Sequence, residues 1–417
     1  MTDAKVHSDD TARKVRRRHV FYIPGYDPIH PRRYRELYRS ESAAQAAISG
    51  YAITLAPKAR GKTYGWQVDA TIEGATVKAE IDVMIWSDIV RDSMSNSIPA
   101  TYWQLVRTAW TYIASGTLRR LMWMRKGPVI AALYPVAMLL LQLALAIGLG
   151  AAAAGLIAMI PVEGLLAQIL EVVGWGVWIG IAVVVLRWFK KKDGKIFAYY
   201  LMHDYAYSAR WNGANPPALE DRMAHFANQI AAALKSDVDE VLVVGHSSGA
   251  HLGVSILSDV IRDGRVPMDG PTLSFLSVGQ VVPMVSFLPD ATRLRRDLAF
   301  LSVQDMAWVD VTAPGDGCAF ALCDPVAVSG VGPKNQRWPL VISAAFTKTL
   351  SQERWKELRW RFFRLHFQYL CAFDRPGDYD YFRITAGPLT LGDRFRNRQP
   401  SKTRIDVPAS KYTSMAP

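Results

Sequence analysis

The feature that most constrains this chain is a long apolar segment near its middle. Between residues 129 and 186 there is no lysine, arginine or aspartate, and the only acidic residues are Glu163 and Glu171. A membrane-spanning helix needs about 20 consecutive apolar residues, so this segment is long enough for two spans. Pro161, Glu163 and Gly164 mark a turn between them, because proline and glycine interrupt helices. The sequence therefore predicts a helical hairpin.

The residues on either side of the hairpin predict its orientation. We place the first span within residues 129–153 and the second within residues 172–189, which leaves Glu163 and Glu171 at the far interface, where charge is tolerated. Both flanks are basic, with Arg119, Arg120, Arg125 and Lys126 before the hairpin and Arg187, Lys190, Lys191, Lys192 and Lys195 after it. Loops rich in lysine and arginine stay in the cytoplasm, so we expect a bacterial inner-membrane protein with both termini inside. The alternative is a buried hairpin in a soluble protein or oligomer.

Composition and charge set further limits. Of the 417 residues, 50% are hydrophobic and 11% aromatic, which is ample for a packed core. The formal net charge is +12, and the basic residues gather in RKVRRRH (residues 13–19) and beside the hairpin, not along a nucleic-acid-binding motif. We therefore expect an anionic membrane surface as a partner and no nucleic acid. The three cysteines, Cys318, Cys323 and Cys371, form neither a disulfide framework nor a zinc-binding pattern.

A second segment, DEVLVVGHSSGAHLGVSIL (residues 239–257), contains a candidate nucleophile. Its first part is an apolar, β-branched run typical of a buried parallel strand, and residues 250–261 have the apolar spacing of a helix. Between them lies Gly245-His246-Ser247-Ser248-Gly249, a G-x-S-x-G motif. In this motif a tight strand-to-helix turn lifts the central serine clear of the sheet, and the glycines let neighbouring backbone pass close by.

This strand, turn and helix resemble the nucleophile elbow of the α/β-hydrolase superfamily. The resemblance implies a serine, an acid and a histidine in that order along the chain, and a mostly parallel sheet flanked by helices. His366, in RWRFFRLHFQYL, is the only histidine beyond the helix of the motif, and so the only candidate base in that order. For the acid, Asp316 lies on a glycine-flanked turn after an expected strand over residues 308–312. Asp310 within that strand and Asp324 beyond it are alternatives.

An oxyanion hole needs backbone N–H groups aimed at the negative charge that develops on the substrate. The resemblance assigns one of them to Ser248, the residue after the nucleophile, and the other to a loop after an early strand. The segment HVFYIPGYDP supplies such a strand and loop, and we place the second N–H on Tyr26. Pro24 stands where many relatives have histidine, which leaves the backbone role of the loop unchanged. His246 and His251, on either side of the serine, are interpreted as structural.

The remaining patterns divide the chain into five parts. We expect a basic flexible tail (1–18), the first part of an α/β-hydrolase domain (19–127), the transmembrane hairpin (128–189), the second part of the domain with the catalytic triad (190–391) and a polar, disordered C-terminal tail (392–417). Helices are expected near residues 31–48, 99–116 and 217–235, and strands near residues 20, 272 and 308, with an extended segment near Ile196. The stretch HDYAYSARW (His203 to Trp211) either lines an acyl pocket or covers the core.

Together these features predict a membrane-anchored, lipase-like esterase that cleaves a carboxylic ester through an acyl-enzyme intermediate, with a lipid acyl ester as a candidate substrate. The expected site consists of the triad Ser247, Asp316 and His366, the oxyanion donors Tyr26 and Ser248, and the elbow glycines Gly245 and Gly249. We expect no cofactor and no metal, since the sequence holds no Walker motif, no GxGxxG and no metal-ligand cluster. The same triad suits a thioesterase, an amidase or an acyltransferase. Outside the enzymes, the alternative is a membrane scaffold that keeps the fold without the chemistry, and the sequence leaves the oligomeric state open.

Overall fold

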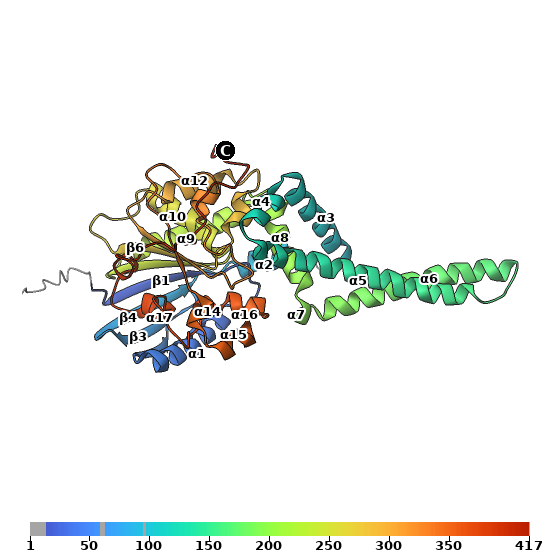
Figure 1. Ribbon diagram of the computed structural model, residues 1–417, viewed down its shortest axis with the longest axis horizontal. Coiled ribbons are helices and arrows are strands. Elements are labelled where there is room, and N and C mark those ends of the chain that lie inside the picture. Colours follow the sequence, from blue (N-terminus) through green and yellow to red (C-terminus); the bar gives the residue numbers. More distant parts are fainter. Residues whose placement is uncertain (1–13, 59–62, 95–96, 417) are drawn as a thin grey trace, which may run out of the picture.

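A computed structural model of the protein describes residues 14–58, 63–94 and 97–416 (Figure 1). Its centre is one sheet of eight strands in the spatial order β2-β3-β4-β1-β5-β6-β7-β8. The strands are β1 (Arg17–Ile23), β2 (Ala52–Pro57), β3 (Gly65–Ile72), β4 (Ala75–Val83), β5 (Glu240–His246), β6 (Thr272–Val278), β7 (Ala307–Thr312) and β8 (Leu340–Ser343). From β4 to β8 the neighbours run parallel, and β3 pairs antiparallel with both β2 and β4.

The hydrophobic pattern explains where each strand lies in the sheet. β5 is buried at every position, as expected for a central parallel strand that is covered on both faces. In β3, buried residues recur at every second position, which suits an antiparallel strand near the edge. The expected α/β class with a mostly parallel sheet is thus confirmed.

Helices cover both faces of this sheet (Figure 1). One face packs against α1 (Arg32–Ser49) and a C-terminal group made of α14 (Phe346–Thr349), α15 (Gln352–Leu358), α16 (Phe362–His366) and α17 (Tyr381–Ala386). The other face packs against α9 (Pro217–Ala233), α10 (Gly249–Arg262) and α12 (Thr292–Leu301). Two separate hydrophobic cores result, one on each side of the sheet.

Two long helices project from this domain as an antiparallel pair (Figure 1). α5 (Lys126–Ala158) and α6 (Leu165–Lys191) are each long and apolar enough to cross a membrane, which confirms the expected pair of apolar helices. Only 22% and 6% of their most apolar windows are buried, whereas a core helix of a soluble protein would be mostly covered. The residues that the structure describes therefore leave most of the hairpin uncovered. The helices meet closely at Gly150, where an added Cβ would lie 2.6 Å from the Trp178 ring.

The segment after the hairpin differs from expectation. In place of an extended segment near Ile196 the chain forms α7 (Asp193–Ile196) and α8 (Ala198–Arg210). The Asp193 carboxylate accepts hydrogen bonds from the backbone N–H groups of Tyr199 and Tyr200, at 2.9 and 3.0 Å, and so satisfies donors that the first turn of α8 would leave unpaired.

Both expected tails also need correction. Residues 1–13 lie outside the described residues, but residues 14–18 are held in place. Arg18 belongs to β1, and its fully buried guanidinium pairs with Glu240 at 2.6 Å. At the other end residues 392–416 are ordered against the domain, where the backbone of Ile405 hydrogen-bonds to that of Leu322 and Asp324. Polar composition predicted a disordered tail, but hydrogen bonds to the domain order it.

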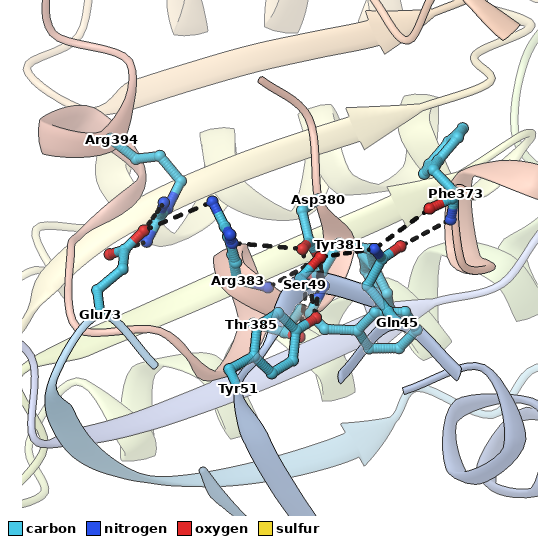
Figure 2. Close-up of polar contacts among 11 residues, drawn as sticks. Gln45, Ser49, Tyr51, Glu73, Phe373, Asp380, Tyr381, Arg383, Thr385 and Arg394 are labelled. Carbon is cyan, nitrogen blue, oxygen red and sulfur yellow. Dashed lines mark hydrogen bonds and ion pairs between the residues drawn. The ribbon is translucent and has the colours of Figure 1, made fainter. Parts of the chain in front are cut away.

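The C-terminal part of the chain is fastened to its N-terminal part by polar contacts (Figure 2). The side-chain amide of Gln45, on α1, donates to the carbonyl of Phe373 and accepts from the N–H of the same residue, at 3.3 and 2.7 Å. Beyond them Arg394 binds both carboxylate oxygens of Glu73, in the turn between β3 and β4. The segment that follows α16 is thereby fastened both to α1 and to the turn between β3 and β4.

Candidate active site

The strand β5 ends at His246 and the helix α10 begins at Gly249, so Ser247 and Ser248 form the turn between them. Ser247 has a φ of 57°, in the left-handed region that residues with a side chain rarely occupy. Its N–H donates to the carbonyl of Val278 at the end of β6, at 3.0 Å. A strained residue that is held this firmly is typical of a functional turn.

The two glycines of the motif are required by close backbone contacts. A Cβ on Gly245 would lie 2.6 Å from the carbonyl oxygen of Gly249, and a Cβ on Gly249 would lie 2.1 Å from that of Ile23. Both distances are far shorter than van der Waals contact, so neither position accepts a side chain without a backbone shift. The helix α10 can therefore approach β1 and β5 closely enough to present Ser247 at the edge of the sheet.

Ser247 lies where open parallel sheets commonly bind ligands. β1 lies between β4 and β5. After β1 the chain forms the strands on one side of it, β2 to β4, and from β5 onward it forms the strands on the other side. Such a switch point opens a crevice at the carboxyl ends of the two strands. The loop after β1 approaches the serine so closely that a Cβ on Gly25 would lie 3.0 Å from Ser247 Cβ.

The two backbone N–H groups expected to form an oxyanion hole both lie at this crevice. Among the hydrogen bonds of the described residues, neither the Tyr26 N–H nor the Ser248 N–H has an acceptor. The loop that carries Tyr26 is fixed in place, because Trp86 Nε1 donates to the carbonyl of Pro24 at 3.0 Å and the Tyr200 hydroxyl donates to that of Tyr26 at 2.6 Å. Two unpaired donors on rigid backbone are what an oxyanion hole requires.

The structure brings His366 and Asp316 together. His366 ends α16, and its Nδ1 lies 2.7 Å from Asp316 Oδ2. Asp316 also accepts the Cys318 N–H at 2.8 Å and the Tyr369 hydroxyl at 3.0 Å. Since a carboxylate oxygen accepts, Nδ1 carries the ring proton and Nε2 is left with a free lone pair. This is the tautomer that a general base needs.

Tyr369 is a site residue that sequence reasoning missed. Its hydroxyl donates to Asp316 and accepts the N–H of Ala313, at 3.0 and 2.9 Å. Burial, together with the nearby Asp316, holds the pKa of Tyr369 well above its usual value, so the hydroxyl keeps its proton and remains a donor. The position three residues after His366 was the only available signal, and that spacing is too common to be diagnostic.

The two alternative acids are engaged elsewhere. Asp310, within β7, accepts the hydroxyl of Ser277 at 2.6 Å, and burial raises its pKa to about 8. Asp324 accepts the N–H groups of Val326 and Ala327 and so caps α13 (Pro325–Val328). Burial raises the pKa of Asp324 to about 6. Neither residue has a contact with the histidine among those of the described residues, whereas Asp316 has one.

The high pKa of Asp310 predicts a pH dependence of folding. Between about pH 4 and pH 8 the folded chain keeps a proton on Asp310 that the unfolded chain releases, so Asp310 lowers stability increasingly as the pH rises. Asp310→Asn keeps the bond from Ser277 and removes this titration. Between pH 5 and pH 9 the melting temperature of the variant should therefore fall by about 2 to 5 °C less than that of the unsubstituted protein. An equal fall in both proteins would contradict a buried, protonated Asp310.

Of the two histidines beside the serine, His246 is held by hydrogen bonds of its own. His246 Nε2 lies 3.0 Å from the backbone carbonyl of His366, which can only accept, so Nε2 carries the proton and Nδ1 accepts from the Tyr22 hydroxyl at 3.3 Å. Burial and the nearby His366 hold the pKa of His246 well below its usual value. Burial lowers the pKa of His251 to about 4. His246 thus fixes the backbone at His366, in agreement with the structural role that we expected.

A cavity of about 1210 Å³ joins these residues. Ser247 and His366 both line it. Gly279, which follows Val278, lies so close to the histidine that an added Cβ would be 3.1 Å from His366 Cε1. The hydrogen bonds of the described residues do not include one between Ser247 Oγ and His366. In enzymes without substrate such contacts are often long and tighten only when the substrate binds.

The cavity wall also contains a carboxyl group that sequence reasoning did not single out. Asp204, on α8, lies within HDYAYSARW, and Tyr205 and Ser208 of the same stretch line the cavity beside it. The stretch therefore lines a pocket. Asp204 has no hydrogen-bond partner among the described residues, and burial raises its pKa to about 7. Near neutral pH it is thus partly protonated and able to donate a hydrogen bond to a bound molecule.

Two groups of side chains have the spacing of metal ligands. Asp316, Cys318 and His366 form one group, in which the histidine and the carboxylate already pair with each other. His19, Glu80 and Asp82 form the other, and there the Lys58 ammonium lies 2.7 Å from Glu80 and 2.5 Å from Asp82. Lys58 thus already supplies a cation to both carboxylates of this group.

Comparison with protein-family models, with curated proteins and with solved structures found no match for this chain. Around the cavity lie a serine in a left-handed turn, a histidine paired with an aspartate, and two backbone N–H groups for which the described residues provide no acceptor.

Proposed function

We propose that this protein is a membrane-anchored serine hydrolase of the α/β-hydrolase type, which cleaves a carboxylic ester. The observation that carries the proposal is the pairing, at 2.7 Å, of Asp316 with His366, a histidine that lines the same cavity as Ser247. The G-x-S-x-G turn, the glycine contacts and the position at a switch point of the sheet add support.

The reaction uses each of these groups in turn. Ser247 Oγ attacks the ester carbonyl while His366 Nε2 takes its proton, and Asp316 stabilises the imidazolium that forms. The N–H groups of Tyr26 and Ser248 bind the negative oxygen of the tetrahedral intermediate. The imidazolium returns the proton to the leaving alcohol, which leaves an acyl-serine. Water, activated by His366, then releases the acid and restores the serine.

The extent of the cavity favours a substrate with an acyl chain. From Ser247 the cavity reaches Pro128, in the first turn of α5, and Asp193, Gly194 and Phe197, which follow α6 closely. One end of the cavity therefore lies at the base of the hairpin. In a membrane-anchored protein this end would lie next to the bilayer, so an acyl ester could enter without crossing water.

The anchor in this proposal is the hairpin of α5 and α6. Both helices are long and apolar enough to span a bilayer, and their side chains are mostly uncovered. Arg125 and Lys126 precede the hairpin and Lys191 and Lys192 end it, so the rule that basic loops remain in the cytoplasm assigns the catalytic domain and both termini to that side.

A fluorophosphonate probe tests the proposed chemistry directly. Purified full-length protein should acquire one adduct, which peptide mass spectrometry should locate on Ser247, because only an activated serine displaces fluoride at a useful rate. Heat-denatured protein should not react. An unmodified chain, or an adduct at another serine, would contradict the proposal and favour a scaffold without catalysis. Turnover of matched esters, thioesters, amides and phospholipids then assigns the substrate class.

A further inference from the structure

The helix α3 (Ile98–Ala114) carries an apolar face that no other described part of the chain covers. Trp103, Val106, Trp110 and Ile113 follow one another at intervals of three, four and three residues, so they lie along one side of the helix. All four are exposed, and the two tryptophans have 67% and 72% of their surface free. We call these four residues the α3 stripe. The opposite side of α3 is buried.

The neighbouring helix α4 (Thr117–Met124) extends this surface. Met122 and Trp123 are exposed there, and Trp123 has 80% of its surface free. A soluble monomer rarely exposes so many large apolar side chains together, and tryptophan is especially frequent at membrane interfaces. Something therefore covers this surface in the working protein.

The charge of the same segment favours an anionic partner. From residue 98 to residue 126 the sequence contains no aspartate and no glutamate, but five basic residues. Arg107 and Arg119 are exposed on α3 and α4, and Arg119 lies over the Trp123 ring, 5.9 Å from its centroid. Exposed tryptophans with arginine beside them are typical of surfaces that bind in the headgroup region of anionic membranes.

The position of α3 against the hairpin supports the same partner. The Tyr102 hydroxyl donates to the carbonyl of Leu139, partway along α5, at 2.9 Å. From Leu139 to the end of α5 at Ala158 about 20 residues remain, or about 30 Å of helix, which is the thickness of the apolar part of a bilayer. The α3 stripe therefore begins at the level where the hairpin would enter the membrane. Figure 1 shows α3 beside the base of the hairpin.

We propose that the α3 stripe and Trp123 bind the headgroup region of an anionic lipid bilayer, as a second membrane contact beside the hairpin. This inference rests on the proposed membrane anchoring. A hairpin alone leaves the domain free to tilt, whereas a second contact fixes its orientation. The end of the cavity at Pro128, two residues after α5 begins, is then kept on the side of the domain that faces the lipid surface.

Depth measurements on the full chain test the proposal. Val106→Cys and Trp110→Cys place spin labels on the α3 stripe. Ile147→Cys places one on α5, and Met268→Cys places one on an exposed loop that precedes β6, at the sheet edge opposite the cavity. The unsubstituted chain reports the signal of the three native cysteines. Each protein is embedded in nanodiscs of phosphatidylcholine and phosphatidylglycerol, and collision with oxygen, which concentrates in lipid, is compared with collision with a water-soluble nickel chelate.

We expect the ratio of oxygen to nickel collisions at both stripe positions to be several-fold higher than at residue 268 and lower than at residue 147. If the labels on the stripe collided with the nickel chelate as often as the label at residue 268, while residue 147 stayed protected, this inference would be overturned and the anchor would remain. Protection of the stripe from both reagents would also overturn it, in favour of a protein partner or a second copy. Exposure of residue 147 to nickel would instead overturn the anchoring itself.

Discussion

Ser247→Ala is expected to lower kcat for ester hydrolysis by at least about 10³-fold and to leave the protein folded. The substitution removes only the hydroxyl that attacks the substrate, while the cavity and the His366–Asp316 pair remain. Members of a triad act as a unit, so the loss of the nucleophile removes nearly all of their joint contribution. The left-handed φ at Ser247 costs alanine about as much as serine, so stability should change little.

The matched control is Ser208→Ala, which removes another serine hydroxyl from the wall of the same cavity. Its activity should stay within a few fold of that of the unsubstituted protein. Circular dichroism and the melting temperature confirm that both variants fold. If Ser247→Ala kept more than a tenth of the activity, Ser247 would not be the nucleophile, and any hydrolysis would have to come from another group.

Asp316→Asn is expected to lower kcat by about 10⁴-fold, the size of loss that the same change causes in a serine protease triad. Asp316 accepts three hydrogen bonds, from Cys318, Tyr369 and His366. The asparagine amide has only one oxygen. If that oxygen keeps the hydrogen bond from the Cys318 N–H, the amide NH₂ group points toward His366 Nδ1. The ring would then carry its proton on Nε2, where it cannot accept the proton of the serine.

Asp310→Asn and Asp324→Asn serve as controls for this substitution. Asp310 pairs with Ser277 inside the sheet, and Asp324 caps α13, so both changes should affect stability more than kcat. The parallel measurement separates the three aspartates. Near-normal turnover in Asp316→Asn with a large loss in one of the others would assign the acid differently, and full activity in all three would mean that His366 works without any of them.

The features that the sequence predicted well depend on local patterns. The apolar run, the two serines and the flanking glycines at residues 240–249 each favour the same strand-to-helix turn, so no distant contact was needed to recognise it. The hairpin was predictable for the same reason, because its apolar length has few alternatives. The preference for Asp316 over Asp310 as candidate acid also came from a local pattern, because a side chain on a turn after a strand can reach the carboxyl edge of the sheet, while a residue inside the strand points toward one face.

The features that were missed depend on contacts between distant parts of the chain. Tyr369 matters through Asp316 and Ala313, more than fifty residues earlier, and no local pattern announces that contact. Asp204 gains its high pKa from burial, which only the folded chain creates. The C-terminal segment was judged by its polar composition, but its order comes from backbone hydrogen bonds to Leu322 and Asp324.

The position of the hairpin in the sequence, between two strands of the sheet, sets an order of events during synthesis. β1 pairs with β4 on one side and with β5 on the other, and the whole hairpin lies between β4 and β5 in the sequence. The ribosome therefore completes both apolar helices before β5 exists. Until then one edge of β1 lacks its hydrogen-bond partners, and Arg18 lacks Glu240. If the hairpin enters the bilayer as it is made, the sheet closes only after that step, and the serine, the aspartate and the histidine all emerge later still.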